Sequence, residues 1–330
     1  MTATTTQLWP IAFTDVLAAR DRLAPFLTPS PLRRHPLLDE ATGLQLLVKH
    51  ENHQPTGSFK IRNGLSFMTG LSADERRRGV VAASTGNHGQ GIAYGAAQLG
   101  VRATICVPRG NNPEKNAAMR GWGARVVEEG SDYDESVLTM QRIAQTEGRV
   151  VAHSTNHPRI VAGAGTMTLE ILEQAQDDGI DAIVLAVGGG SQAVGALTVA
   201  RELTPHIAVY GVQAVGASAQ HDSWHARERR STERADTFAE GVATRSTYDL
   251  TFPALLEGLT GFITLTDAEI AEGVRIILST THNVVEGAGA MGVMGAMKLR
   301  SELAGKRVAV AFCGGNLDSA VLRRILNKEI

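Results

Sequence analysis

The chain has 330 residues, with 32 lysines and arginines against 34 aspartates and glutamates, and a formal net charge of −2. Charges of both signs are spread along the sequence, which argues against a nucleic acid or an anionic membrane as partner. Cys106 and Cys313 both lie in apolar runs, which favours a reduced cytoplasmic protein over a disulfide-bonded secreted one. The threonine-rich first residues lack the hydrophobic core of a signal peptide, and no apolar run reaches the length of a membrane span.

Short apolar runs along the chain predict β-strands, and the amphipathic stretches between them predict helices. The expected strands are residues 44–48, 80–83, 103–107, 125–127, 182–187, 208–212 and 308–312, and the expected helices include 132–147, 166–177 and 268–279. Strands rich in valine and isoleucine that alternate with helices predict an α/β fold of mainly parallel sheets covered on both faces. Residues 214–246 are polar and are expected to form an irregular surface segment.

Ligands in such folds bind at the carboxyl ends of the strands, and the loop at residues 51–64 follows the first expected strand. Thr56, Gly57 and Ser58 can begin a helix that places Lys60 in its first turn, where the helix dipole disfavours a cation. Burial would lower the pKa of the amine further and favour a nucleophilic lysine. The alternative is a lysine whose stem packs while its ammonium reaches solvent, and this segment alone does not separate the two.

Two further loops have the character of anion sites. The stretch Ser84-Thr85-Gly86-Asn87-His88 joins a strand to a helix, where backbone N–H groups can bind a carboxylate. The alternative is a tight turn capped by Ser84 or Asn87. Gly188-Gly189-Gly190-Ser191 follows the longest apolar strand, and its consecutive glycines let several N–H groups converge on a phosphate. A plain flexible turn is the alternative there, and the spacing matches neither a Walker loop nor a dinucleotide-binding loop.

Several stretches together resemble the signatures of one enzyme family. They are Gln54-Pro55-Thr56-Gly57-Ser58-Phe59-Lys60-Ile61-Arg62, Ser84-Thr85-Gly86-Asn87-His88, Gly188-Gly189-Gly190-Ser191 and Cys313-Gly314-Gly315-Asn316. They resemble the tryptophan-synthase-β-like pyridoxal phosphate enzymes of fold type II, and within that group the threonine/serine dehydratases and serine racemases. The resemblance implies two open twisted sheets with the site between them. It implies a large cofactor-binding domain of residues 1–70 and 158–330, and a small domain of residues 71–157 that carries the substrate-carboxylate loop.

The same resemblance implies roles for individual residues. Lys60 would hold pyridoxal 5'-phosphate as an imine and, once freed, remove the α-proton of the substrate. The other implied cofactor contacts are Phe59, Asn87, Gly188, Gly189, Gly190, Ser191, Glu286, Cys313 and Gly314. The implied substrate contacts are Ser84, Thr85, Gly86, Asn87, His88 and Gly241. Cys313 would face the ring nitrogen, where the lack of a carboxylate makes the cofactor a weaker electron sink and suits prompt loss of a β-leaving group.

The predicted reaction is the dehydration and deamination of a small β-hydroxy amino acid, such as L-threonine or L-serine, to a 2-oxo acid and ammonia. One alternative is a serine or aspartate racemase, in which Thr85 would act on the opposite face of the substrate. Others are a dehydratase for hydroxyaspartate, phenylserine or a compatible-solute derivative, and a binding protein without catalytic activity. At the family's cation site this chain has Gln213 and Ala219, so no metal is expected. A cytoplasmic homodimer is expected.

Overall fold

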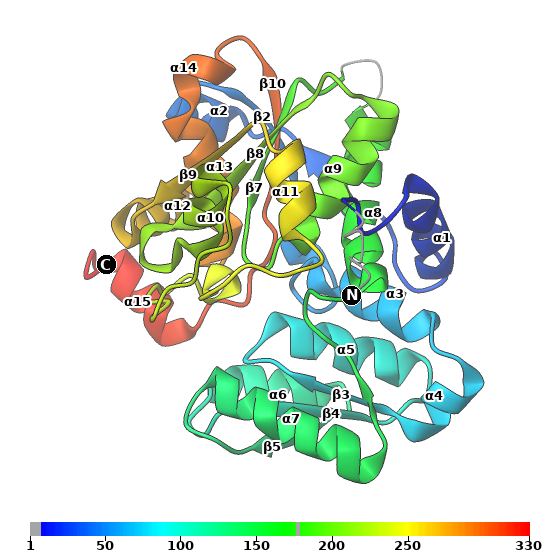
Figure 1. Cartoon of the computed structure of the whole chain (residues 1–330). Coiled ribbons are helices and arrows are strands. Elements are labelled where there is room, and N and C mark those ends of the chain that lie inside the picture. Colours follow the sequence, from blue (N-terminus) through cyan, green and yellow to red (C-terminus); the bar gives the residue numbers. More distant parts are fainter. Residues whose placement is uncertain (1–7, 176–178) are drawn as a thin grey trace.

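The computed structural model describes residues 8–175 and 179–330, and its strands form two separate sheets (Figure 1). The larger sheet has the strand order β1-β2-β10-β7-β8-β9. Its strands are β1 (Leu32–Arg33), β2 (Gln45–Lys49), β7 (Ala182–Ala186), β8 (Ala208–Ala214), β9 (Gly261–Leu265) and β10 (Arg307–Ala311). Only the pairing of β1 with β2 is antiparallel among these described strands. The α/β fold predicted from the sequence is therefore confirmed.

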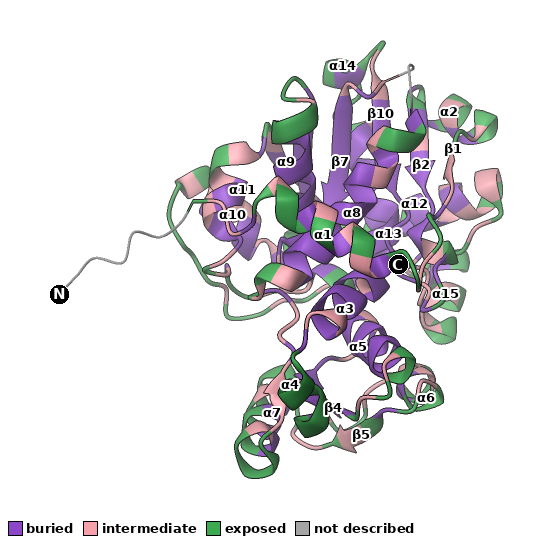
Figure 2. Ribbon diagram, turned by 90° about the vertical axis from the view of Figure 1, so that its right-hand side faces the viewer, coloured by how far each residue is buried: buried purple, intermediate pink, exposed green. Residues whose placement is uncertain are grey.

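The smaller sheet is wholly parallel and has the order β5-β4-β3-β6. Its strands are β3 (Val80–Ala83), β4 (Ala103–Val107), β5 (Arg125–Glu128) and β6 (Val150–Val151). The strands β3, β4 and β7 are buried at every residue, as expected for sheets with helices on both faces. Figure 2 shows buried strands beneath helices whose outer faces are exposed.

Helices cover both sheets. They are α1 (Phe13–Leu23), α2 (Pro36–Thr42), α3 (Lys60–Thr69), α4 (Ala73–Arg78), α5 (Asn87–Gln98), α6 (Pro113–Gly121), α7 (Tyr133–Glu147), α8 (Pro158–Ala175), α9 (Ser191–Leu203), α10 (Ala219–Ala226), α11 (Phe252–Gly258), α12 (Asp267–Thr281), α13 (Gly287–Lys298), α14 (Arg300–Leu303) and α15 (Ser319–Leu326). Within the described residues, none of them has both the length and the apolar character that crossing a membrane requires.

Most predicted elements lie within two residues of their observed bounds, but two predictions need correction. The segment 214–246 is not irregular throughout, because α10 occupies residues 219–226. The expected helix 166–177 is the second half of the longer α8, and its last two residues lie outside the described residues. The short strands β1 and β6 were not predicted, since two residues carry no periodic pattern.

Glycines allow α3 and α5 to cross at very close range, and this crossing joins the segment that begins at Lys60 to the smaller sheet. A Cβ atom built on Gly64 would collide with the carbonyl oxygen of Gly91, and one on Gly91 would collide with the carbonyl oxygen of Lys60. Since both obstacles are backbone atoms, they cannot move aside as a flexible side chain can. The start of α3 is therefore fixed against α5.

Replacing Gly64 with alanine should lower the free energy of unfolding by about 1–3 kcal/mol, the usual cost of overpacking. Gly121→Ala is the matched control, because Gly121 ends α6 and a Cβ there would meet nothing within 4 Å. Urea denaturation measures both variants. We expect the control to be at least as stable as the wild type, and a Gly64→Ala protein of wild-type stability would contradict the close crossing.

Candidate active site

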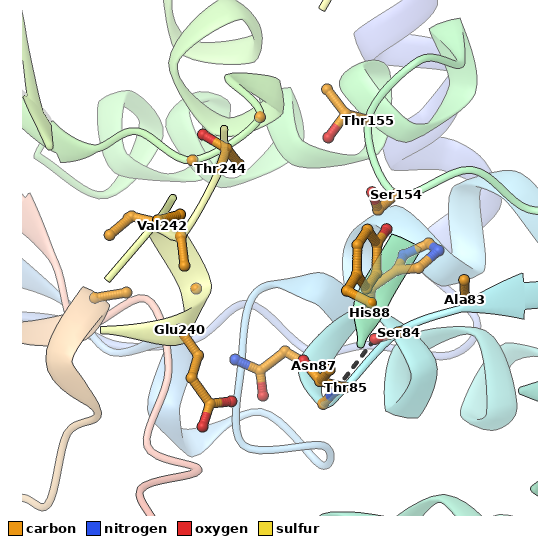
Figure 3. A pocket seen from close by; sticks show the side chains of 18 of the residues that line it. Ala83, Ser84, Thr85, Asn87, His88, Ser154, Thr155, Glu240, Val242 and Thr244 are labelled. Carbon is orange, nitrogen blue, oxygen red and sulfur yellow. Dashed lines mark hydrogen bonds between the residues drawn. The ribbon is translucent and has the colours of Figure 1, made fainter. Parts of the chain in front are cut away.

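A cavity of 1070 Å³ lies where the carboxyl ends of strands from both sheets meet, and it brings together nearly all the predicted site residues (Figure 3). The predicted residues that line it are Phe59, Lys60, Ser84, Thr85, Gly86, Asn87, His88, Gly188, Gly189, Gly190, Ser191, Gly241, Glu286 and Cys313. Gly314 does not line the cavity. It lies behind Glu286, whose carboxylate occupies the place where a Cβ of residue 314 would stand.

Lys60 is the first residue of α3 and is partly buried in the cavity wall. Two features fix the backbone of the loop that leads into Lys60. Gly57 has a φ of +66°, and the Phe59 N–H donates a hydrogen bond to the carbonyl oxygen of Cys313. Burial lowers the pKa of the Lys60 amine to about 8. Among the described residues no carboxylate forms an ion pair with it, and the Phe59 ring centroid lies 5.0 Å from Nζ. A far larger share of this amine is therefore unprotonated near neutral pH than of an ordinary lysine.

The loop Ser84–His88 is held in shape by its own side chains. The Ser84 hydroxyl accepts hydrogen bonds from the backbone N–H groups of Gly86 and Gly89, at 3.2 and 2.9 Å. The Nε2 atom of His88 lies 2.9 Å from the carbonyl oxygen of Ala152, so it donates to that oxygen. Burial lowers the pKa of His88 to about 3, and the ring is therefore neutral at physiological pH. His88 supports the loop and brings no positive charge to it.

A hydrogen-bonded chain links Asn87 and Glu286, which line the cavity, to Asn316 behind them. Asn87 Nδ2 donates to Glu286 Oε1 at 2.7 Å, and Asn316 Nδ2 donates to Asn87 Oδ1 at 2.7 Å. Asn316 Nδ2 also donates to the carbonyl oxygen of Thr56, at 2.8 Å, in the loop before Lys60. Burial raises the pKa of Glu286, although Asn87 opposes the shift. Asn316 belongs to a stretch recognised in the sequence, but its role in joining two loops becomes visible only when the partners are known.

The triple-glycine loop presents backbone donors to the cavity. Within residues 8–175 and 179–330, the N–H groups of Gly188, Gly189 and Gly190 donate to no protein acceptor. Gly190 has φ of +94°, and a Cβ on Gly188 would lie 2.5 Å from the carbonyl oxygen of Gly241. The next residue, Ser191, begins α9, whose positive dipole end adds to the attraction for an anion. The loop has the donor set of a phosphate site.

Cys313 is buried at the end of β10, where burial raises the pKa of its thiol. The sulfur is therefore an S–H group and not a reactive thiolate. A protonated Cys313 thiol can pack as a small neutral side chain against a ligand bound in the cavity, but it cannot act as a nucleophile.

A buried charge network lies beneath α3, two residues beyond Lys60. Arg62 donates to both oxygens of Glu51 at 2.8 Å and to both oxygens of Glu170 at 2.7 Å. Lys49 Nζ donates to Glu170 at 2.6 Å. Because Glu51 follows β2 and Glu170 lies on α8, the network ties the lysine-bearing helix to both elements. Arg62 stands in the recognised stretch, whereas its two carboxylate partners could not be identified from the sequence.

At the position expected to lack a cation, Gln213 takes part in hydrogen bonds. Its Oε1 atom accepts the N–H groups of Gln220 and His221 at 3.1 and 3.0 Å. In the part of the chain that the structure describes, no group of three or more histidine, cysteine, aspartate or glutamate side chains is arranged to hold a metal ion. The expectation that the protein needs no metal remains a prediction.

Comparison with known proteins gives consistent matches along the chain. The family described as pyridoxal-phosphate dependent enzyme matches residues 23–314. An L-threonine ammonia-lyase of Thermotoga maritima is 36% identical over 320 residues, which is 97% of this chain and 79% of that protein. An L-threo-3-hydroxyaspartate ammonia-lyase of a Pseudomonas species is 33% identical over 93% of this chain and 96% of its own length. The crystal structure of T.th. threonine deaminase has a TM-score of 0.88 at 34% identity and covers 93% of this chain and 99% of its own.

Proposed function

The chain belongs to the family of pyridoxal-phosphate dependent enzymes, and from this premise we propose that it is an ammonia-lyase acting on a small β-hydroxy amino acid such as L-threonine or L-serine. The products would be a 2-oxo acid and ammonia. The observation that carries this proposal is one cavity that holds an amine of lowered pKa between two anion-binding loops. The relatives named as threonine and hydroxyaspartate ammonia-lyases support the same reaction.

The residues in the cavity fit pyridoxal 5'-phosphate. Lys60 offers an amine free of any ion pair among the described residues, which suits attachment of an aldehyde. The N–H groups of Gly188, Gly189 and Gly190, with Ser191 at the start of α9, offer unpaired donors for a phosphate. Phe59, Asn87, Glu286 and Cys313 would complete the walls, with Gly314 backing Glu286. When bound, the cofactor supplies an electron sink that stabilises negative charge at the substrate Cα.

The protein residues then divide the remaining tasks. Backbone N–H groups and the hydroxyls of Ser84 and Thr85 would bind the substrate carboxylate, and Gly86 lets it approach closely. Asn87 and neutral His88 keep this loop in place, and Gly241 forms the facing wall. Lys60 Nζ takes the α-proton and holds it. Its lowered pKa suits this task, because a general base works best when its pKa is near the working pH.

The domain division and the assembly are also proposals. We propose a large domain of residues 1–70 and 158–330 and a small domain of residues 71–157, which agrees with the confinement of β3 to β6 to residues 80–151. We further propose a cytoplasmic homodimer. The two buried free cysteines agree with a reducing compartment. Light scattering on the purified protein should give twice the chain mass of 35.0 kDa, and a monomeric mass would contradict the homodimer.

A substrate panel tests the proposed activity. Release of 2-oxo acid should be found with L-threonine, L-serine or both, and it should be far slower with the D-isomers, because the carboxylate loop and Lys60 fix the face from which the α-proton leaves. Coupling to lactate dehydrogenase follows the product continuously. Failure to release a 2-oxo acid from any β-hydroxy amino acid in the panel would refute the proposal.

The lowered pKa of Lys60 predicts how the cofactor attaches. Only the unprotonated amine attacks an aldehyde, so attachment to the cofactor-free protein should accelerate as pH rises, with a midpoint at about pH 8. An ordinary lysine would have its midpoint at about pH 10.4. Stopped-flow absorbance measures the rate at each pH. A profile that shows no midpoint below about pH 10 would contradict the effect of burial on Lys60.

A further inference from the structure

An ion pair that the sequence did not reveal lies in the lining of the cavity. Lys115 lies on α6, between β4 and β5 of the smaller sheet, and Glu240 lies in the turn Glu240–Val242, between β8 and β9 of the larger sheet. Lys115 Nζ lies 2.5 Å from Glu240 Oε2, and both residues line the cavity. The two side chains differ in exposure, at 12% for Lys115 and 54% for Glu240. The cation is therefore held in the wall, while its carboxylate partner can swing into solvent.

The stem of Lys115 packs directly on the loop proposed to bind the substrate carboxylate. A Cβ built on Gly86 would lie 3.3 Å from Lys115 Cδ. Figure 3 shows the Glu240 side chain extending from its turn into the cavity on the side of Asn87 and Thr85. The charges of both residues also act on Glu286, because Lys115 lowers the pKa of the Glu286 carboxyl and Glu240 raises it. A substrate whose carboxylate occupies the loop would thus have its side chain near this pair.

Other cations that line the cavity are less suited to meeting a substrate side chain. Lys60 is committed to the chemistry, and Arg245 is paired with Asp134. Arg109 and Arg234 are exposed to solvent. Lys115 is the partly buried cation beside the carboxylate loop, and it already has a carboxylate at hydrogen-bonding distance.

We propose that the Lys115–Glu240 pair sets the substrate class of this site. Glu240 occupies the anion position on Lys115, so the enzyme favours a β-hydroxy amino acid with a neutral β-substituent. A substrate with a second carboxylate must displace Glu240 and would be repelled by it, which is selection through an unfavourable contact. The inference rests on the proposed function, since it concerns the substrate of that same reaction.

The test removes the competing charge and measures selectivity. In Glu240→Gln, the ratio of kcat/KM for L-threo-3-hydroxyaspartate to kcat/KM for L-threonine should rise by at least about tenfold, the lower end of the effect of one hydrogen bond to a charged group. In the double variant Lys115→Met/Glu240→Gln this gain should disappear. The matched control is Glu233→Gln, because Glu233 lines the same cavity and forms no ion pair among the described residues. It should keep the wild-type ratio.

A binding measurement provides a readout independent of turnover. Calorimetric titration of the cofactor-loaded protein with succinate should show about tenfold tighter binding to Glu240→Gln than to the wild type. Butanoate, which has one carboxylate, should bind both proteins equally. The double variant should bind succinate no better than the wild type.

Three results would overturn the inference. One is an unchanged ratio and unchanged succinate affinity in Glu240→Gln. Another is an equal gain in Glu233→Gln, which would indicate a general effect of net charge. The third is a wild-type enzyme that already prefers the diacid to threonine. If the wild type acts on no β-hydroxy amino acid of the panel, the proposed function fails instead, and the succinate titration still decides whether Glu240 competes for Lys115.

Discussion

Replacing Lys60 with alanine should lower kcat by at least about a thousandfold, because the substitution removes both the base and the site of cofactor attachment. The absorbance band of the lysine-bound cofactor should disappear from the same preparation. Lys60→Arg should fail as well, since a guanidinium remains protonated and cannot provide a neutral amine. These effects follow from the position of Lys60 at the start of α3, inside the cavity and with a pKa of about 8.

Lys306→Ala is the control, because Lys306 precedes β10 and does not line the cavity. It should keep the wild-type activity and spectrum. Circular dichroism would show whether the Lys60 variants are folded, so that lost activity is not confused with lost structure. Activity within about tenfold of the wild type in folded Lys60→Ala would contradict the role of this residue, since general-base catalysis alone contributes about 10²- to 10⁴-fold.

Replacing Arg62 with methionine should lower the free energy of unfolding by about 3–5 kcal/mol, the cost of removing one partner from a buried ion pair. The side chains of Arg62 and Glu51 are almost fully inaccessible to solvent. Methionine would fill part of the space but leave Glu51 without a cation within hydrogen-bonding distance and Glu170 with only Lys49. The variant isolates this network, which fixes the start of the lysine-bearing helix.

The pH dependence of the free energy of unfolding is a second test of Arg62→Met. Burial opposes ionisation of Glu51, but Arg62 and the Ser30 hydroxyl outweigh it and hold the pKa of Glu51 below its ordinary value. A carboxylate whose pKa is lowered in the folded state stabilises the protein above its unfolded pKa, and this contribution is lost as the pH falls through the folded pKa. In Arg62→Met burial is no longer outweighed, so acidification from neutral pH should recover part of the lost stability.

Arg77→Met is the matched control for denaturation. The Arg77 side chain is 71% exposed and is paired with Asp74 on the surface of α4. Exposed pairs contribute about 0–1 kcal/mol, so this variant should unfold close to the wild-type midpoint. An Arg62→Met protein within about 1 kcal/mol of the wild type would mean that the network does not behave as a buried ion pair.

Features with a local signal could be predicted from the sequence. The buried strands β3 and β7 are continuous apolar runs, and the turn that follows β7 carries Gly188 where its backbone closely approaches the backbone of Gly241. The order β1-β2-β10-β7-β8-β9 could not be predicted, because β2 pairs with a strand more than 250 residues away. Periodicity describes one segment at a time and contains nothing about its partner.

In the candidate site, too, single stretches could be predicted from the sequence, whereas contacts between distant residues could not. Lys60 and the triple-glycine loop carry their chemistry in consecutive residues, so a recognised stretch was enough to identify them. Lys115 is an unremarkable helix lysine in the sequence, and Glu240 adjoins the predicted site residue Gly241, but their pairing appears only when the fold places them 2.5 Å apart. The link from Asn316 to Asn87 likewise depends on two loops that are distant in the sequence. Contacts between pairs of residues on opposite sides of the cavity could not be predicted from the sequence.

The central claim is that this cavity eliminates the β-hydroxyl of its substrate and does not invert its Cα. The most direct test incubates the cofactor-loaded protein with L-serine and measures pyruvate, ammonia and D-serine in the same samples over time. We predict pyruvate and ammonia in equal amounts, well in excess of D-serine, because Lys60 takes the α-proton and the hydroxyl then leaves. D-serine as the dominant product, with little pyruvate, would contradict the claim and identify the protein as a racemase.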